Sequence, residues 1–414
     1  MVPGRLLISV ITLLLFISQC PAQKLDSLFS GGKTAYDSGY FEQSLAYFET
    51  FQKIRDNYPP TVMYLAMLYS QTGQDDKAFE KLNKLLIMNA DTAFLSRSDF
   101  DPVRDKQRFK EIRLRYETML SPVHHSELAF SLEEAEVHPE TLAYDAERSR
   151  FFIGSIRLRS IYIYESGRSY VFKSGGEDSL LAVTGMDIDR EEGLLWVASA
   201  NFPQMKEQEN AADGSFIHVY DIISGSLLRR FHLAGDVLIG DLIVGRRGDV
   251  YMTNSRSPEI YRATIDSVYQ WKSFPELRSL QGITEGAGND IYFSDYIHGI
   301  FHIKGESMAR VSHPDSVSVK GIDGLYFRNG KLIGMQNGVF PQRVTQFELV
   351  KEEVIGKAVF LDKNLEELNE PVQGVWVGDW FYFIANSPWA YYNDSYDLDA
   401  SAPKPEIWRT NLVR

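Results

Sequence analysis

Two patterns of hydrophobic and polar residues divide the chain. From about residue 23 to residue 121, apolar residues recur every three or four positions, a spacing typical of helices. Beyond Ser121-Pro122 they form short runs, rich in aromatic and branched side chains, between turns of Gly, Asp and Asn. The sequence therefore predicts an α + β multidomain protein, with a helical domain over 23–121 and an all-β domain over 126–414.

The helical part contains a repeat with a spacing of 34 residues. "AYDSGYFEQSLAYF" (35–48) can be laid over "LYSQTGQDDKAFEKL" (68–82), which pairs Gly39 with Gly73, Ser44 with Ala78 and Phe48 with Leu82. This pattern resembles the tetratricopeptide repeat, and we expect a capping helix over 99–120. Because so short an array is marginal alone, the resemblance implies either a groove for a protein partner or a structural cap.

The all-β part contains six repeats of one unit, in which a short strand, a polar turn and an aromatic-rich strand follow one another. The units are 140–155, 184–201, 240–254, 281–295, 323–337 and 373–386. Their starts lie 44, 56, 41, 42 and 50 residues apart, which suits one four-stranded blade per unit. The sequence therefore predicts a six-bladed propeller.

The two ends of the β region complement each other. The sixth unit offers only one further strand, "EIWRTNL" (406–412), before the chain stops at Arg414. The segment "SELAFSLEE" (126–134) precedes the first unit and has no other partner. We expect it to supply the missing strand, so that the ring has no open edge.

The first residue of each unit enters the strand that lines the central channel, so that six side chains point toward one axis. We call these the mouth positions: Glu140, Thr184, Gly240, Gln281, Asp323 and Gln373. With Asp241, which follows Gly240, they form an oxygen-rich ring. Calcium takes six to eight such oxygens, so the sequence predicts a Ca²⁺ site formed by Glu140, Asp241, Gln281 and Asp323. Zinc is disfavoured because no His or Cys shares these positions.

The second strand of each unit ends in a polar residue on the same face. These residues form a predicted outer ring: Ser155, Asn201, Asn254, Asp295, Asn337 and Asn386. The last five, with Trp389 from the long loop 387–405, are candidate ligand-binding residues for a small molecule. His138 and His298 lie near the predicted mouth, where they are either proton shuttles or solvated or hydrogen-bonded loop histidines, the interpretation we favour. His124-His125 is interpreted as linker.

With these features the region 127–414 resembles the superfamily of six-bladed propellers that contains gluconolactonases, senescence marker protein, paraoxonases and strictosidine synthases. The lactonase branch carries a glutamate in blade one, two asparagines and an aspartate around a catalytic divalent ion, usually calcium. Glu140 and Asp323 match the two acids, whereas Gln281 and Gly240 replace the asparagines. The resemblance implies lactone or ester hydrolysis with Asp323 as base or nucleophile.

The departures at Gln281 and Gly240 keep a second hypothesis open. In it the protein is a non-catalytic module that binds a ligand at the mouth or a protein partner through the helical repeats.

The N-terminal sequence and the composition indicate the localisation of the protein and the partners that it excludes. Arg5, an apolar run from Leu6 to Ser18 and Cys20-Pro21-Ala22 predict a signal peptide over 1–22, hence a periplasmic or secreted protein. The alternative is a lipid anchor at Cys20, the only cysteine. No stretch is long enough for a transmembrane helix. The net charge of −13 argues against nucleic acid as a partner.

Overall fold

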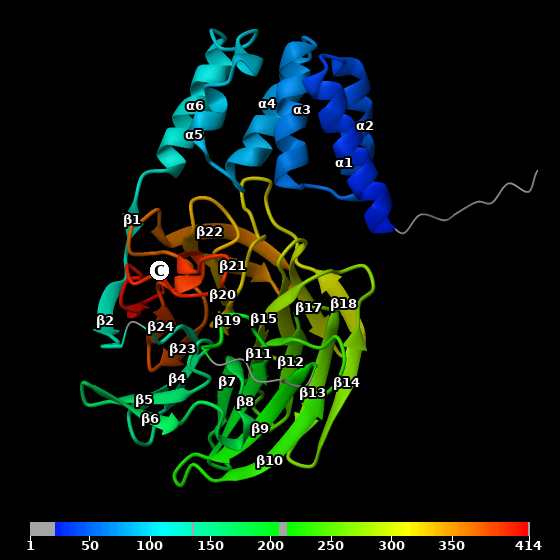
Figure 1. The fold of residues 1–414 in the computed structure, drawn as a ribbon. Coiled ribbons are helices and arrows are strands. Elements are labelled where there is room, and N and C mark those ends of the chain that lie inside the picture. The colour runs from blue at the N-terminus through cyan, green and yellow to red at the C-terminus, as the bar shows by residue number, and fades with distance from the viewer. Residues whose placement is uncertain (1–20, 135, 207–212, 413–414) are drawn as a thin grey trace, which may run out of the picture. The chain divides into compact units, whose positions relative to one another are not determined.

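A computed structural model describes residues 21–134, 136–206 and 213–412 of the chain (Figure 1). They form two compact units: one holds 21–85 with Ala93–Ile112, the other Leu86–Thr92 with 113–412. Among these residues no helix is long and apolar enough to cross a membrane. Most of the predicted signal peptide, including Cys20, lies outside the described residues.

The first part of the chain is helical, as predicted. Its elements are α1 (Pro21–Asp37), α2 (Phe41–Ile54), α3 (Pro59–Gln71), α4 (Asp75–Leu86), α5 (Thr92–Leu95), the 3-10 turn η1 (Ser98–Phe100) and α6 (Gln107–Met119).

The two predicted repeat glycines end α1 and α3. Gly39 and Gly73 have φ of 77° and 72°, a conformation that glycine adopts without strain. Ser44 of α2 is fully buried and donates to the Gly32 carbonyl at 2.8 Å, so that α1 and α2 pack closely. Phe48 stacks on Tyr64 with ring centroids 4.6 Å apart. The helical hairpins are thus confirmed, while their assignment as tetratricopeptide repeats stays a prediction.

The second part forms six antiparallel sheets, one for each predicted unit, in the order along the chain. Blade one has β3 (Pro139–Asp145), β4 (Arg150–Ser155), β5 (Ile161–Glu165) and β6 (Arg168–Lys173), and blade two has β7 (Ala182–Asp189), β8 (Leu194–Ala200), β9 (Ser215–Asp221) and β10 (Leu227–Leu233). Blade three has β11 (Ile239–Val244), β12 (Val250–Asn254), β13 (Glu259–Thr264) and β14 (Ser267–Ser273). Blade four has β15 (Leu280–Glu285), β16 (Ile291–Asp295), β17 (Gly299–Lys304) and β18 (Ser307–Arg310).

The last two blades take strands from the beginning of the region. Blade five has β19 (Leu325–Arg328), β20 (Lys331–Gln336), β21 (Arg343–Lys351), β22 (Val354–Lys363) and an added edge strand, β1 (Val123–His124). Blade six has β23 (Gly374–Val377), β24 (Trp380–Ile384), β25 (Glu406–Thr410) and β2 (Glu127–Ser131). The first strands of blades one to five contact one another in succession, and β23 contacts β3. The N–H of Gly374 in β23 donates to the Tyr326 hydroxyl of β19 at 2.7 Å, so the sheets form a six-bladed propeller.

The predicted closure of the ring is confirmed. Strand β2 pairs antiparallel with β25, with Glu127 opposite Arg409 and Phe130 opposite Ile407. The linker interpretation of His124 is wrong, because its backbone pairs with Asp362 in β22 and its ring stacks on Trp408 at 5.0 Å. The edge of β22 offered unpaired backbone groups, which β1 satisfies.

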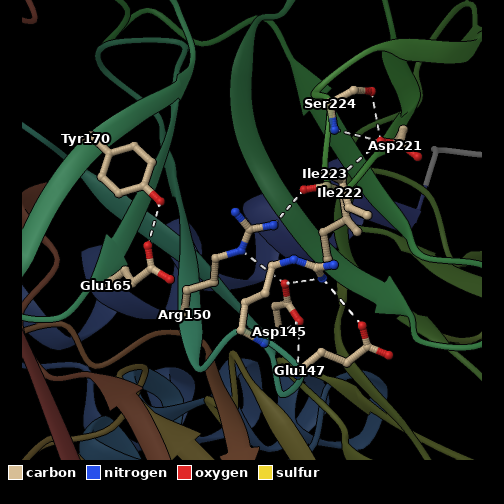
Figure 2. A network of polar contacts seen from close by, with 10 residues as sticks. Asp145, Glu147, Arg150, Glu165, Tyr170, Asp221, Ile222, Ile223 and Ser224 are labelled. Atoms are coloured by element: carbon tan, nitrogen blue, oxygen red, sulfur yellow. Dashed lines mark hydrogen bonds and ion pairs between the residues drawn. The ribbon is translucent and has the colours of Figure 1, made fainter.

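Neighbouring blades are also joined by polar contacts away from the mouth. Arg150 at the start of β4 donates from Nε to Asp145 Oδ2 at 3.0 Å and from an Nη to the Ile222 carbonyl of blade two at 2.7 Å (Figure 2). Around it, Asp221 accepts from the backbone of the turn that contains Ser224. Because Arg150 is buried, its bond to the Ile222 carbonyl holds blade one against blade two, while its ion pair with Asp145 joins β3 and β4 within blade one.

Candidate functional site

A cavity of about 360 Å³ lies at the mouth of the propeller, and five of the six mouth positions line it. They are Glu140, Thr184, Gly240, Gln281 and Asp323. The sixth, Gln373, donates to the carbonyls of Thr184 and Gly240 at 2.9 and 3.0 Å, so it joins blade six to blades two and three.

The backbone of the inner strands explains why these side chains converge. In blades one to four the mouth residue has no pairing partner in the second strand. In blade one, for example, Pro139 and Thr141 have partners in β4, and in blade three Ile239 and Asp241 have partners in β12, but the residue between them does not. Such β-bulges are frequent next to binding sites because the extra residue re-aims its side chain. The bulges therefore turn Glu140, Thr184 and Gln281 toward the axis.

Glu140 is held by two donors from the long loop of blade six. Its Oε2 accepts from Trp389 Nε1 at 3.0 Å and from Ser387 Oγ at 3.3 Å. Burial, and then the charge of Asp323, raise the pKa of the Glu140 carboxyl well above its ordinary value, and Glu370 adds to this. Trp389, which was predicted to lie near the mouth, thus donates an indole hydrogen bond to Glu140.

Asp323 is positioned by blades four and five. Its backbone N–H donates to the Met335 carbonyl at 2.8 Å, and its Oδ2 accepts from Asn337 Nδ2 at 2.8 Å. Tyr296 donates in turn to Asn337 Oδ1 at 2.9 Å, which fixes the orientation of the amide. Burial raises the pKa of Asp323 to about 6 in spite of the Asn337 bond, and the charge of Glu370 acts in the same direction.

Glu370 is a third carboxylate in the cavity lining that the sequence reasoning missed. It has a positive φ of 58°, and its side chain accepts from Gln342 Nε2 at 2.8 Å while its backbone N–H donates to Gln342 Oε1. Burial raises its pKa. Glu370 lies in a loop outside the repeat units, and only its place three residues before Gln373 hinted at the mouth.

Gln281 and Ser255 fill the space beside Gly240. Gln281 Oε1 accepts from Ser255 Oγ at 3.2 Å, and its Nε2 donates to Ser279 Oγ at 3.0 Å. A Cβ placed on Gly240 would lie 2.2 Å from Ser255 Oγ and 3.3 Å from Gln281 Oε1. Ser255 and Gln281 therefore occupy the space that a side chain at residue 240 would need.

Gly240→Ala is expected to lower the free energy of unfolding by about 1–3 kcal/mol, because the new methyl group must displace the Ser255 hydroxyl. The double variant with Ser255→Ala should recover part of this loss, since the hydroxyl is then absent. Urea unfolding of the two single variants and the double variant measures this coupling. Strictly additive losses would show that Gly240 and Ser255 do not compete for space.

The prediction that Asp241 joins the mouth residues is wrong. Asp241 does not line the cavity. Its Oδ1 accepts from the N–H of Leu242 at 2.8 Å, and its Oδ2 accepts from the N–H of Ile283 at 3.1 Å. The physical reason is the alternation of a strand, in which the residue after the mouth position points the other way. The carboxylate thus joins blade three to β15 of blade four.

The predicted outer ring divides into two groups. Of that ring Asn337 lines the cavity, as does the separate candidate Trp389. The side chains of Asn254, Asp295 and Asn386 instead accept backbone N–H groups of nearby loops, those of Leu238, Arg278 and Glu406 respectively. Ser155 accepts from Leu158 N–H in the same way, and Asn201 is exposed and outside the lining. These loops need acceptors for their N–H groups, which a polar strand end supplies.

The two histidines near the mouth are hydrogen-bonded and lie outside the lining. His138 Nδ1 is 2.9 Å from the Tyr392 hydroxyl, and burial lowers the pKa of this fully buried imidazole to about 3. His298 Nδ1 is 2.8 Å from Asp295 Oδ1.

Among the described residues, Phe202 also lines the cavity, and its ring centroid lies 5.9 Å from that of Trp389.

The acids that could hold a cation in the cavity are a smaller set than the predicted one. Among the residues described, no three His, Cys, Asp or Glu side chains gather closely enough to hold a metal by themselves. Glu140 Oε1 and Asp323 Oδ1 have no hydrogen-bond partner in this part of the chain, and no Lys or Arg lines the cavity. Two carboxylates completed by neutral oxygens and water are a shell that calcium accepts.

No family model matches the sequence, and no curated protein matches it. Among solved structures, the PQQ-bound aldose sugar dehydrogenase of Streptomyces coelicolor is 13% identical over 70% of this chain and 99% of its own, with a TM-score of 0.48. A gluconolactonase of Xanthomonas campestris is 12% identical over 71% and 98%, with a TM-score of 0.47. Virginiamycin B lyase of Staphylococcus aureus is 12% identical over 70% and 100%, with a TM-score of 0.45. Likenesses of this degree carry no argument about activity.

Proposed function

We propose that the mouth of the propeller binds a divalent cation, calcium first, together with a small polar molecule, and hydrolyses a lactone or ester there. One observation carries the proposal: Glu140 and Asp323 enter the same cavity from different blades, and no Lys or Arg among its lining residues offsets their charge. Buried carboxylates without a counter-charge favour a bound cation.

The neighbouring residues support the two acids as a positioned pair. Trp389 and Ser387 hold one oxygen of Glu140, and Asn337 holds one oxygen of Asp323, which leaves the other oxygen of each for a ligand. A bound cation would supply Lewis-acid polarisation of a carbonyl oxygen. Asp323 Oδ1 is the atom we assign to accept a proton from the attacking water, and the Asn337 bond keeps that carboxylate from rotating.

The size of the cavity limits the substrate. About 360 Å³ accommodates a molecule of monosaccharide size, and Ser255, Ser279 and Gln281 offer hydroxyl and amide groups on one side. Phe202 and Trp389 offer an apolar wall on another. A hydroxylated lactone or a small ester suits this combination.

Export is part of the proposal, on the basis of residues 1–22 alone. Calcium sites of extracellular modules commonly have dissociation constants of about 10⁻⁴–10⁻³ M, so a site with only two carboxylates is sufficient outside the cytoplasm.

Glu140→Gln is expected to lower hydrolysis by about a hundredfold or more, because it removes one of the two carboxylates assigned to hold the cation. The test is turnover of a panel of lactones and aryl esters by the full chain, with calcium and with a chelator. Glu133→Gln is the matched control, since Glu133 is exposed and lies outside the cavity lining. Wild-type protein that is inert to the whole panel with calcium present would rule out the hydrolase.

The second candidate is non-catalytic ligand binding at the same cavity. The Gly240, Ser255 and Gln281 arrangement favours it, because two positions that hold asparagines in the lactonase branch are here a glycine and a hydrogen-bonded glutamine. In that case calcium and a small ligand bind while no member of the panel is turned over.

A further inference from the structure

A second cavity, of about 300 Å³, lies in blade five and is separate from the mouth. All its lining residues belong to the unit formed by Leu86–Thr92 and 113–412. Arg343, Lys357, Ser316 and Ser318 are among its polar lining residues. No carboxylate occurs among the described residues that line it.

Arg343 is buried without a counter-charge. It is 1% exposed, and no acidic side chain of the described chain pairs with it. Its Nε donates to Gln336 Oε1 at 3.1 Å and one Nη to the Ile87 carbonyl at 2.7 Å. The other Nη has only the sulfur of Met119, at 3.9 Å, which is a weak acceptor. One arm of the guanidinium therefore lacks an oxygen partner.

A second cation lies directly opposite Arg343 in the sheet. Lys363 of β22 is its cross-strand partner, is 4% exposed, and donates only to the Thr118 carbonyl at 3.3 Å. Both cations lie over the Phe360 ring, at 5.2 and 5.1 Å from its centroid. Like charges placed opposite each other destabilise a sheet. Burial also lowers the pKa of Arg343 to about 10 and, together with Arg343, lowers that of Lys363.

The apolar part of the lining includes Met119, Val317 and Phe360. The volume exceeds what a bare inorganic ion fills, so a fitting ligand carries an apolar body behind its charge. We propose that this cavity binds a small organic carboxylate, with its head on Arg343 and its hydrocarbon part against Met119, Val317 and Phe360. A carboxylate matches the planar donors of a guanidinium and offsets the buried charge of Arg343.

The test uses hexanoate, hexan-1-ol and inorganic phosphate as probes of the full chain, at constant ionic strength with sodium chloride. Isothermal titration and the shift of the melting temperature are the readouts. Saturable binding of hexanoate, with at least tenfold weaker binding of the alcohol and of phosphate, is expected. Hexanol binding as tightly as hexanoate, phosphate binding as tightly, or no binding of hexanoate overturns the proposal.

Two variants locate the site. Arg343→Met is expected to abolish hexanoate binding, but it also removes the contact with Ile87. Lys357→Glu leaves Arg343 and its partners in place, and is expected to weaken hexanoate binding by about tenfold through repulsion at the cavity wall. Lys351→Glu makes the same charge change at an exposed residue outside the lining. Equal affinities for the Lys357→Glu and Lys351→Glu proteins would contradict the assignment.

Discussion

Phe130→Ala is expected to lower the free energy of unfolding of the propeller by about 3 kcal/mol, the lower end of the range for a buried phenylalanine. Phe130 lies on β2, is 8% exposed, and stacks on Tyr164 with ring centroids 3.7 Å apart. It also contacts Phe151, so its removal leaves a cavity between the closing strand and blade one. Urea unfolding followed by tryptophan fluorescence measures the loss.

Leu128→Ala is the matched control for this variant. Leu128 lies on the same strand and pairs with Trp408, but its side chain is 55% exposed. Its replacement should change the unfolding free energy by no more than about 0.5 kcal/mol. If both variants unfold like the wild type, β2 does not close the ring in solution.

Asp323→Asn is expected to weaken calcium binding by about a hundredfold or more, because an amide replaces one of only two carboxylate ligands. The size of the new side chain is nearly the same, and Asn337 can still hydrogen-bond to its oxygen. Loss of affinity with an unchanged melting temperature in chelator would therefore report the lost charge and not a lost fold. Calcium titration of both proteins by calorimetry gives the two affinities.

Glu285→Gln serves as the control for this change. Glu285 ends β15 and its ion pair with Arg246 lies outside the cavity lining. The same neutralisation there should leave the calcium affinity unchanged. Equal weakening in both variants would mean that the net charge of the protein, and not the mouth, governs binding.

The repeat pattern was sufficient to predict the propeller because each blade repeats the same local physics. A short strand, a polar turn and an aromatic-rich strand recur six times, and a missing strand at one end implies a donor at the other. The same reasoning aligned the mouth positions, so Glu140 and Asp323 were placed in one cavity although 183 positions separate them in the printed numbering.

What the pattern could not predict depends on single side chains and on loops. Asp241 is next to a mouth position, and strand alternation turns it to the backbone of Leu242 and Ile283. Glu370 reaches the cavity from a loop whose path is set by Gln342, a contact with no repeat behind it. The polar strand ends Asn254 and Asn386 accept the N–H groups of Leu238 and Glu406, contacts that composition does not reveal.

The most direct test of the proposed site is the number of calcium ions bound by the purified wild-type protein at neutral pH after removal of adventitious metal. The carboxylate pair Glu140 and Asp323 predicts one ion per chain, bound in competition with a chelator and lost in Asp323→Asn. Wild-type protein that binds no calcium, or that binds it equally well in Asp323→Asn, would contradict a cation site at the mouth.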